Sequence, residues 1–240
     1  MAQNAMGVLA MRRVVAVAAV VALAMGGLPV LALEREGSIP EDLMAKRPPH
    51  PNDVYVAVLP FWGMEDSQED IGRACVMLNL MRHGFRLAPK GSRSLAEAAR
   101  RTESALRRDP KYEPLARIEP ADAARVGKAV GAQWAIFGEF GDLRTKSEKE
   151  GGVIPRKVGV IDVRLFVVDV DSGSVLFWSR VQDEFPGGTW PVKATSVERR
   201  LVTRTINRIF DDIGAGMPEH YAGAEVTPEM VQKLLESMRR

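Results

Sequence analysis

The chain alternates short, nearly continuous apolar runs with longer segments in which apolar residues recur at helical spacing. The first run, VYVAVLPF at residues 54–61, is rich in valine and favours a strand buried on both faces of a sheet. Residues 85–88 and 133–140 predict two further strands. A sheet covered by helices is therefore the architecture that the pattern indicates.

A β-hairpin is predicted near the C-terminal end of this pattern. Two alternating runs, residues 158–170 and 174–185, flank the turn Asp171-Ser172-Gly173. In the first run Ile161 and Val163 share one face with the following aliphatic residues, while Asp162 and Arg164 occupy the other. Residues 141–157 between the strands are polar and are expected to be a flexible connection, and Pro186-Gly187-Gly188 is expected to end the sheet.

Helices are predicted wherever apolar residues recur at helical spacing between capping or breaking residues. They run from Asp66 or Ser67 to about His83, over 94–108, from Pro120 to about Gly131, over 193–213 and over 228–239.

The order of these elements determines the fold class. Strands that alternate with helices need crossover connections, whereas the last two strands form a hairpin. We therefore predict an α/β fold: a single domain with a mixed sheet of about five strands, flanking helices, and a C-terminal β-hairpin followed by a helix. The predicted parts are a signal peptide (1–32), a proline-rich linker (33–53), the α/β domain (54–213) and a C-terminal extension with a short helix (214–240).

The N-terminal segment has the features of a secretory signal in their usual order. Two arginines precede an apolar stretch, which a Gly-Gly-x-Pro break interrupts before a possible cleavage site at Ala32. We expect cleavage there, and thus a periplasmic or secreted protein. The alternative is an uncleaved anchor in the inner membrane formed by residues 14–33, which would then be the only membrane contact. No cysteine lies at the cleavage site for lipid attachment.

The charge of the chain is balanced once this segment is set aside. The 240 residues include 33 basic and 31 acidic side chains, and two of the basic ones lie in residues 1–32. This balance, with 46% hydrophobic residues, excludes a disordered chain and gives no reason to expect a nucleic-acid partner. Residues 90–111 form a local exception, with seven basic and three acidic residues, which we interpret as a solvated helix face.

Residues suited to catalysis or metal binding are few. His50, His83 and His220 lack ligand spacing, and Cys75, the single cysteine, sits at helical spacing among apolar residues and is expected to be buried and unreactive. Neither a phosphate-binding loop nor a nucleophile elbow is present. We therefore expect no metal, no cofactor and no enzymatic activity. The alternative is a hydrolase that uses two of the carboxylates of Glu139, Asp142, Asp162 and Asp169, with Glu139 or Asp142 as the residues to test.

Two surfaces are candidates for protein contacts. Phe61 and Trp62 follow the first long strand at its carboxyl end, where α/β sheets commonly place binding surfaces. A tryptophan folded over the edge of the sheet is the alternative interpretation. The outward arginines of helix 193–213, Arg200, Arg204 and Arg208, are candidates for self-association. Of the other tryptophans, Trp134 and Trp178 fall on strands and are expected in the core.

Four segments together resemble a family of envelope proteins. They are VAVLPF, HGFRLAP, ARVGKAVGAQWAIFGEF and VRLFVVDVDSGSVLFWS, which span about residues 54–213. Their order is similar to that in the domain shared by CsgG, LpoB, PelC and the TolB amino-terminal domain. The resemblance implies an α/β domain of the periplasm or outer membrane that works by binding and often forms rings. Two departures are the missing lipid-anchor cysteine and the short, charged segment 141–157, which argues against a channel.

These observations lead to one expected function and two alternatives. The chain is expected to be an exported, non-enzymatic accessory protein that binds a partner in a secretion or envelope-assembly system. The first alternative is a self-assembling ring or scaffold subunit of an export apparatus, with this chain as its own partner. The second is the carboxylate hydrolase.

Overall fold

A six-stranded mixed sheet is the centre of the structure. The computed structural model describes residues 34–38, 54–63, 66–111, 113, 117–150, 154–189, 194–214 and 225–239, all within one unit, Glu34–Arg240. The strands are β1 (Glu34–Ser38), β2 (Tyr55–Trp62), β3 (Arg86–Leu87), β4 (Trp134–Glu150), β5 (Ile154–Asp169) and β6 (Val175–Thr189). The helices are α3 (Asp66–Arg82), α4 (Leu95–Arg108), α5 (Pro120–Ala129), α6 (Ala194–Gly214) and α7 (Pro228–Met238). The predicted signal and residues 39–53 of the predicted linker lie outside the described residues.

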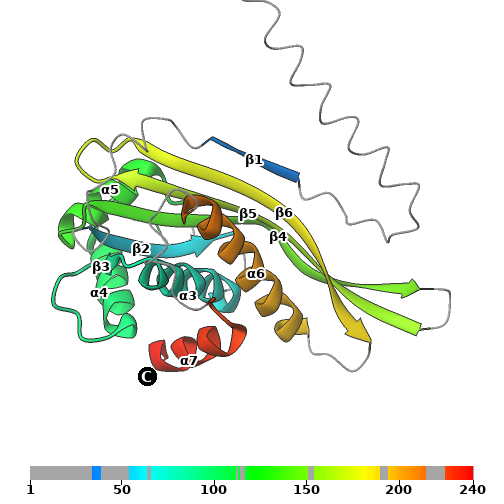
Figure 1. Ribbon diagram of the computed structural model, residues 1–240. Coiled ribbons are helices and arrows are strands. Elements are labelled where there is room, and N and C mark those ends of the chain that lie inside the picture. Colours follow the sequence, from blue (N-terminus) through cyan, green and yellow to red (C-terminus); the bar gives the residue numbers. More distant parts are fainter. Residues whose placement is uncertain are drawn as a thin grey trace, which may run out of the picture. The chain divides into compact units, whose positions relative to one another are not determined.

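The order of strands across the sheet is β1-β6-β5-β4-β2-β3 (Figure 1). Strand β2 is parallel to both β3 and β4, whereas β4, β5 and β6 are antiparallel neighbours. This arrangement confirms the predicted α/β class and its mixed sheet, with the hairpin β5–β6 followed by a helix. The sixth strand, β1, comes from the predicted linker and pairs antiparallel with β6.

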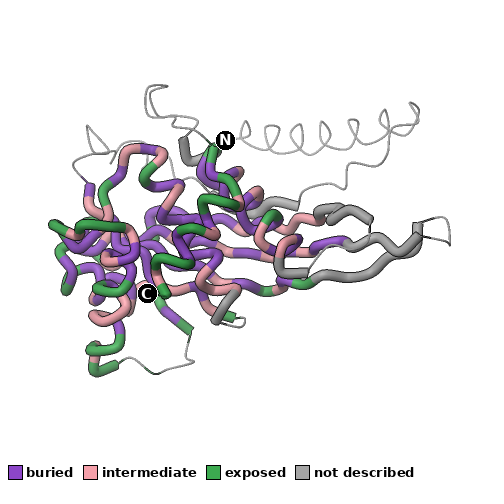
Figure 2. The backbone as a smooth tube through the Cα atoms, turned by 90° about the horizontal axis from the view of Figure 1, so that it is seen from below, coloured by how far each residue is buried: buried purple, intermediate pink, exposed green. Residues whose placement is uncertain are grey.

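Helices pack on both faces of the sheet. On one face α3 and α6 cover the strands, and α7 packs against α3, α4 and α6 (Figure 1). On the other face α5 packs against β2, β4 and β5. In Figure 2 the buried residues follow the strands and the inward sides of these helices. The helices start at conventional caps: Ser94 accepts from Glu97 N before α4, and Thr227 accepts from Met230 N before α7.

The ring of Phe61 packs against β4 and α3, where a glycine on each element leaves room for it. A Cβ at Gly138 of β4 would lie 2.1 Å from Phe61 Cε1, and one at Gly72 of α3 would lie 2.8 Å from Phe61 Cδ1. The ring also contacts Phe140, with centroids 5.1 Å apart. Residues 61, 72 and 138 thus form one packing unit in which any larger side chain at the glycines would displace the phenylalanine.

The polar segment 141–157 is not the flexible connection that its composition suggested. Strands β4 and β5 stay paired from Trp134↔Asp169 to Glu150↔Ile154, so residues 141–150 and 154–157 form the outer parts of two paired strands. Backbone hydrogen bonds between the two strands stabilise this extension, which composition alone does not reveal.

The predicted end of the sheet at Pro186 was wrong for a related reason. Strand β6 continues to Thr189, and its register with β5 shifts between Val158↔Pro186 and Arg156↔Thr189. Proline is tolerated on a strand with an open edge, and the two glycines lie at the irregularity, where a bulge accommodates extra residues. None of the helices in the described part of the chain is long and apolar enough to cross a membrane.

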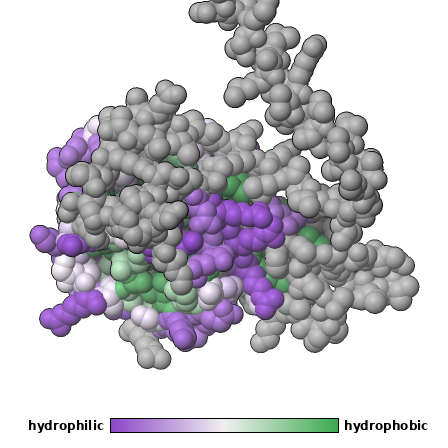
Figure 3. All heavy atoms as spheres, in the orientation of Figure 1, coloured by the Kyte–Doolittle hydropathy of each residue, from purple (hydrophilic) through white to green (hydrophobic). Residues whose placement is uncertain are grey.

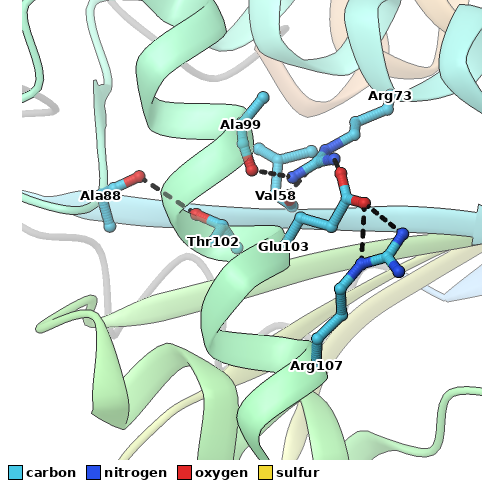
Figure 4. Close-up of polar contacts among 7 residues, drawn as sticks. All are labelled: Val58, Arg73, Ala88, Ala99, Thr102, Glu103 and Arg107. Atoms are coloured by element: carbon cyan, nitrogen blue, oxygen red, sulfur yellow. Dashed lines mark hydrogen bonds and ion pairs between the residues drawn. The ribbon is translucent and has the colours of Figure 1, made fainter.

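A buried arginine joins β2, α3 and α4. Arg73 of α3 is 1% exposed; its guanidinium donates to the carbonyl oxygens of Val58 (3.2 Å) and Ala99 (2.6 Å) and pairs with Glu103 (3.2 Å; Figure 4). Burial lowers the pKa of Arg73, and the Glu103 carboxylate opposes that shift. Burial also acts to raise the pKa of Glu103, but hydrogen bonds from Arg107 and the charge of Arg73 outweigh it, and the pKa lies below its ordinary value.

Buried polar groups also join α3 to α6. Asn79 Nδ2 donates to Asn207 Oδ1 at 2.8 Å, and Asn207 Nδ2 donates to the carbonyl of Val226 at 2.9 Å. Cys75 Sγ lies 3.6 Å from Thr203 Oγ1, and burial raises the pKa of this thiol to about 12. The expected buried, unreactive cysteine is therefore confirmed.

His83 lies at the end of the same helix interface. Its ring is 5% exposed, stacks on Phe210 at 6.1 Å between centroids, and its Nε2 is buried without a hydrogen-bond partner among the described residues. Burial, helped by the charge of neighbouring Arg82, lowers the pKa of His83, while Asp211 acts in the opposite direction. The neutral imidazole is therefore the form that the fold favours.

Replacing Arg73 should destabilise the domain strongly. Arg73→Met removes the hydrogen bonds to the Val58 and Ala99 carbonyls and the ion pair with Glu103 from the core, and we expect a loss of about 3 kcal/mol in the free energy of unfolding. Arg107→Ala, which removes the exposed partner of the same Glu103, should cost less than about 1 kcal/mol. Urea unfolding of both variants measures the difference; equal effects would show that the buried hydrogen bonds are not what matters.

Acid should destabilise the domain through His83. Below pH of about 6.5 the unfolded chain binds a proton that the folded chain resists, so the free energy of unfolding falls as pH drops. His83→Phe, which keeps a ring on Phe210, should reduce this loss between neutral pH and pH of about 5. Thermal or urea unfolding across that range tests it, and identical pH dependence in the two proteins would contradict it.

Candidate functional site

One face of the sheet presents polar side chains beyond the end of α5. Alternation along β5 places Ile161, Val163 and Leu165 against α6 and the core, and places Asp162 and Arg164 on the opposite side, as the sequence predicted. Helix α5 covers that side near Ala135 and Val168, and Ala105 and Leu106 of α4 join the same cluster. We refer to the remaining surface as the open face; its residues are Trp62, Glu139, Asp142, Val160, Asp162, Arg164, Arg180 and Gln182.

A row of aligned residues crosses the open face from β2 to β6. Trp62 is opposite Glu139, Glu139 is opposite Arg164, and Arg164 is opposite Arg180. Glu139 Oε1 lies 3.7 Å from Arg164, and Glu139 Oε2 lies 2.7 Å from Arg117, which precedes α5. The contact with Arg117 is an ion pair whose angles fall outside hydrogen-bond geometry. A tryptophan thus stands beside a half-buried set of charges of both signs.

A second row of aligned residues lies beside the first, two residues away along β5. Asp142, Asp162 and Gln182 are aligned across β4, β5 and β6. Asp162 accepts two hydrogen bonds from Arg180, at 3.0 and 2.8 Å, and one from Gln182 at 3.0 Å. The bonds from Arg180, against the effect of burial, lower the pKa of Asp162.

An irregularity in β4 makes this second row possible. The register shifts between Phe140 and Asp142, so that Gly141 is an extra residue and Asp142 returns to the open face. A Cβ at Gly141 would lie 3.0 Å from Asp162 Oδ2, which leaves little space for a larger residue. Asp142 itself pairs with Arg144 at 3.0 Å.

The two residues predicted for partner contact have different surroundings. Phe61 is 1% exposed and belongs to the core, so it has no surface to offer a partner. Trp62 is half-buried at the end of β2 and begins the first row of the open face. Trp134 and Trp178, expected in the core, are each half-buried, and Trp190 lies outside the described residues.

The arginines predicted for self-association lie on the outer side of α6. The surface over α6 is hydrophilic (Figure 3). Arg204 and Arg208 both approach the same buried carboxylate of β6, Asp183 Oδ2, at 3.5 and 3.2 Å. Arg200 is exposed. Two of the three arginines therefore join α6 to the sheet of their own chain.

The other residues considered for chemistry are dispersed. Asp169 accepts hydrogen bonds from Ser172 N and Ser172 Oγ and so stabilises the hairpin turn. His83 is in the core, and His50 and His220 lie outside the described residues. No group of three or more His, Cys, Asp or Glu suited to a metal ion occurs in the described part of the chain.

The sequence identified single residues of the open face but not their assembly. Trp62, Glu139, Asp142, Asp162 and Arg164 were each noted, whereas Arg117, Arg180 and Gln182 were missed. A signal for two of these was present: a hairpin centred on Ser172 places residue 164 opposite 180 and residue 162 opposite 182, as the structure does. Arg117 lies in a connecting segment whose position no sequence pattern determines.

No protein-family model matches the chain, and no curated protein matches it either. Solved structures match at low similarity. PelC of Paraburkholderia phytofirmans, a dodecamer, is 14% identical with a TM-score of 0.39, over 72% of this chain and 93% of that one. A lipoprotein of Neisseria meningitidis is 12% identical with a TM-score of 0.43 (66% and 99%). The C-terminal domain of LpoB from Salmonella enterica is 11% identical with a TM-score of 0.33 (62% and 90%).

Proposed function

We propose that the chain is an exported, non-enzymatic accessory protein of the cell envelope that binds another envelope protein through the open face. The observation that carries the proposal is the row Trp62–Glu139–Arg164–Arg180 on a part of the sheet that no described helix covers. The export segment read from the sequence and the family resemblance of residues 54–213 support the location and the mode of action.

The composition of the open face suits protein recognition. Tryptophan and arginine are the residues most enriched among those that dominate binding energy at interfaces. The arginine side chains are partly exposed, 36% for Arg164 and 28% for Arg180, and neighbouring carboxylates orient them. An ordered arginine loses less conformational entropy on binding than a free one, because its rotamer is already fixed.

The same ion pairs argue against acid–base catalysis on this face. Glu139, Asp142 and Asp162 each have an arginine nitrogen within 4 Å. A general acid at neutral pH needs a raised pKa, and the pKa of Asp162 is shifted in the opposite direction. The carboxylate hydrolase is therefore the weakest of the three functions.

Self-assembly is the second candidate, and one observation favours it. Strand β1 pairs only with residues 178–182 of β6, so among the described strands none lies beside the outer edge of β6 from Asp183 to Thr189. Unpaired strand edges can add a strand from another copy. The charges of Arg204 and Arg208 are engaged within the chain, which makes the outer side of α6 the less favourable route to assembly.

Photo-crosslinking in cells tests the proposed function. With benzoylphenylalanine at Val160 on the open face, we expect an adduct to a second protein; the control is the same group at exposed Lys233 on α7. Trp62→Ala should reduce the Val160 adduct about tenfold, the scale of a lost aromatic anchor, whereas Trp62→Phe should retain most of it.

The mass of the adduct separates the two candidates. A product of twice the chain mass would indicate self-assembly, and any other discrete mass a different partner. An adduct from Lys233 alone, with none from Val160, would contradict the assignment of the open face.

A further inference from the structure

The outer side of α4 carries a stripe of arginines. Arg100, Arg101, Arg107 and Arg108 are all exposed, while Ala98, Ala99, Thr102 and Leu106 face inward. Residues 100 and 107, like 101 and 108, are seven positions apart, so they lie nearly above one another two turns apart, about 10 Å along the axis. Arg93 and Lys111, both exposed, flank the helix at either end. We define these six residues as the α4 stripe.

The acidic residues of this region do not neutralise the stripe. Glu103 faces Arg73 in the core and pairs with Arg107, Glu97 pairs with Arg101 at 3.8 Å, and Asp109 pairs with Arg125. Within the described residues, the side chains of Arg93, Arg100 and Arg108 have no carboxylate partner; Arg100 donates to the carbonyl of Ser237 at 3.3 Å, and Lys111 N donates to Asp109 at 2.9 Å. Three exposed arginines of the stripe thus have no counter-charge from the part of the chain that the structure describes.

The excess positive charge is concentrated in residues 90–111, and the rest of the chain does not share it. Residues 90–111 hold seven basic and three acidic residues, an excess of four. The rest of residues 33–240 holds 24 basic and 28 acidic residues, a deficit of four. Such separation orients a protein against a surface of opposite charge.

Basic residues beside the stripe contact an aromatic ring. Arg101 Nη1 reaches Ser92 Oγ at 3.4 Å, which brings the segment 90–93 against α4. Lys90 and Arg86, both exposed, lie over the ring of Tyr55 at 5.9 and 5.8 Å from its centroid. Tyrosine beside basic residues is the combination found where proteins meet lipid headgroups.

We propose that the α4 stripe is a docking surface for an anionic phospholipid membrane, with its arginines bound to lipid phosphates. A guanidinium matches the geometry of a phosphate, and an outward helix side can lie on a flat charged surface without a groove. Docking on α4 is independent of the open face, which lies on β2 and β4–β6.

Vesicle binding tests the proposal directly. Residues 33–240, which contain every described element, are mixed with vesicles of phosphatidylglycerol and phosphatidylcholine or of phosphatidylcholine alone. We expect binding only to the anionic vesicles, and its loss at high ionic strength. Arg100→Gln/Arg108→Gln should bind about tenfold more weakly, since each basic residue near an anionic membrane adds to the affinity.

Two further variants keep the result interpretable. Arg144→Gln/Arg200→Gln removes the same charge from exposed positions outside the stripe and should bind like the parent chain. Lys90→Gln/Lys111→Gln lies outside α4 and should weaken binding even if changes within the helix affect folding. Equal binding by all variants, binding to uncharged vesicles, or binding to a DNA duplex but not to anionic vesicles would each overturn the proposal.

Discussion

The hydrogen bonds of one buried guanidinium determine how the helices meet the sheet. Arg73 spans from α3 to a carbonyl of β2 and a carbonyl of α4, and no apolar residue could satisfy both oxygens. Because Ala99 and Glu103 are both anchored in this way, α4 has one rotation about its axis against the core. That rotation determines which of its residues face outward. The arginine stripe on α4 and the buried pairing of Glu103 are consequences of the same contact.

Alternation along the strands separates the structural and the functional sides of the sheet. Most side chains of β4–β6 that face α3 and α6 are aliphatic or aromatic, with Ser179 and Asp183 of β6 as polar exceptions, and the polar side chains on the other side form the rows of the open face. The extra residue Gly141 shifts the alternation of β4 by one position after Phe140, so that Asp142 lies on the charged side and Leu143 lies in the core. Hydrophobic packing on one side thus holds charged groups in register on the other.

The fold was largely predictable from the sequence, because its elements depend on local patterns. The strand at 54–61, the turn at Asp171-Ser172-Gly173 and every described helix follow from apolar periodicity and breaking residues. The extension of β4 and β5 was not predictable, since residues 145–150 of β4 are polar and form a strand only by pairing with residues 154–159 of β5. Arg73 was missed for a similar reason: an arginine in a helical pattern indicates solvent, and only its hydrogen bonds to the Val58 and Ala99 carbonyls and its pairing with Glu103 explain its burial. Predicting which residues meet on the open face requires knowing the strand register. The hairpin turn determines that register for β5 and β6, but no sequence pattern places Arg117 beside Glu139.

The central claim is that the chain works by contact through the open face. Hydroxyl-radical footprinting of the chain in its native envelope, compared with the purified chain, measures this directly. Trp62 reports on the open face, while Met81 and Met230, 50% and 39% exposed on α3 and α7, report on the helix side. The account predicts that Trp62 is protected in the envelope and that the two methionines are oxidised equally in both preparations. Unchanged oxidation of Trp62 together with protection of Met81 or Met230 would contradict it.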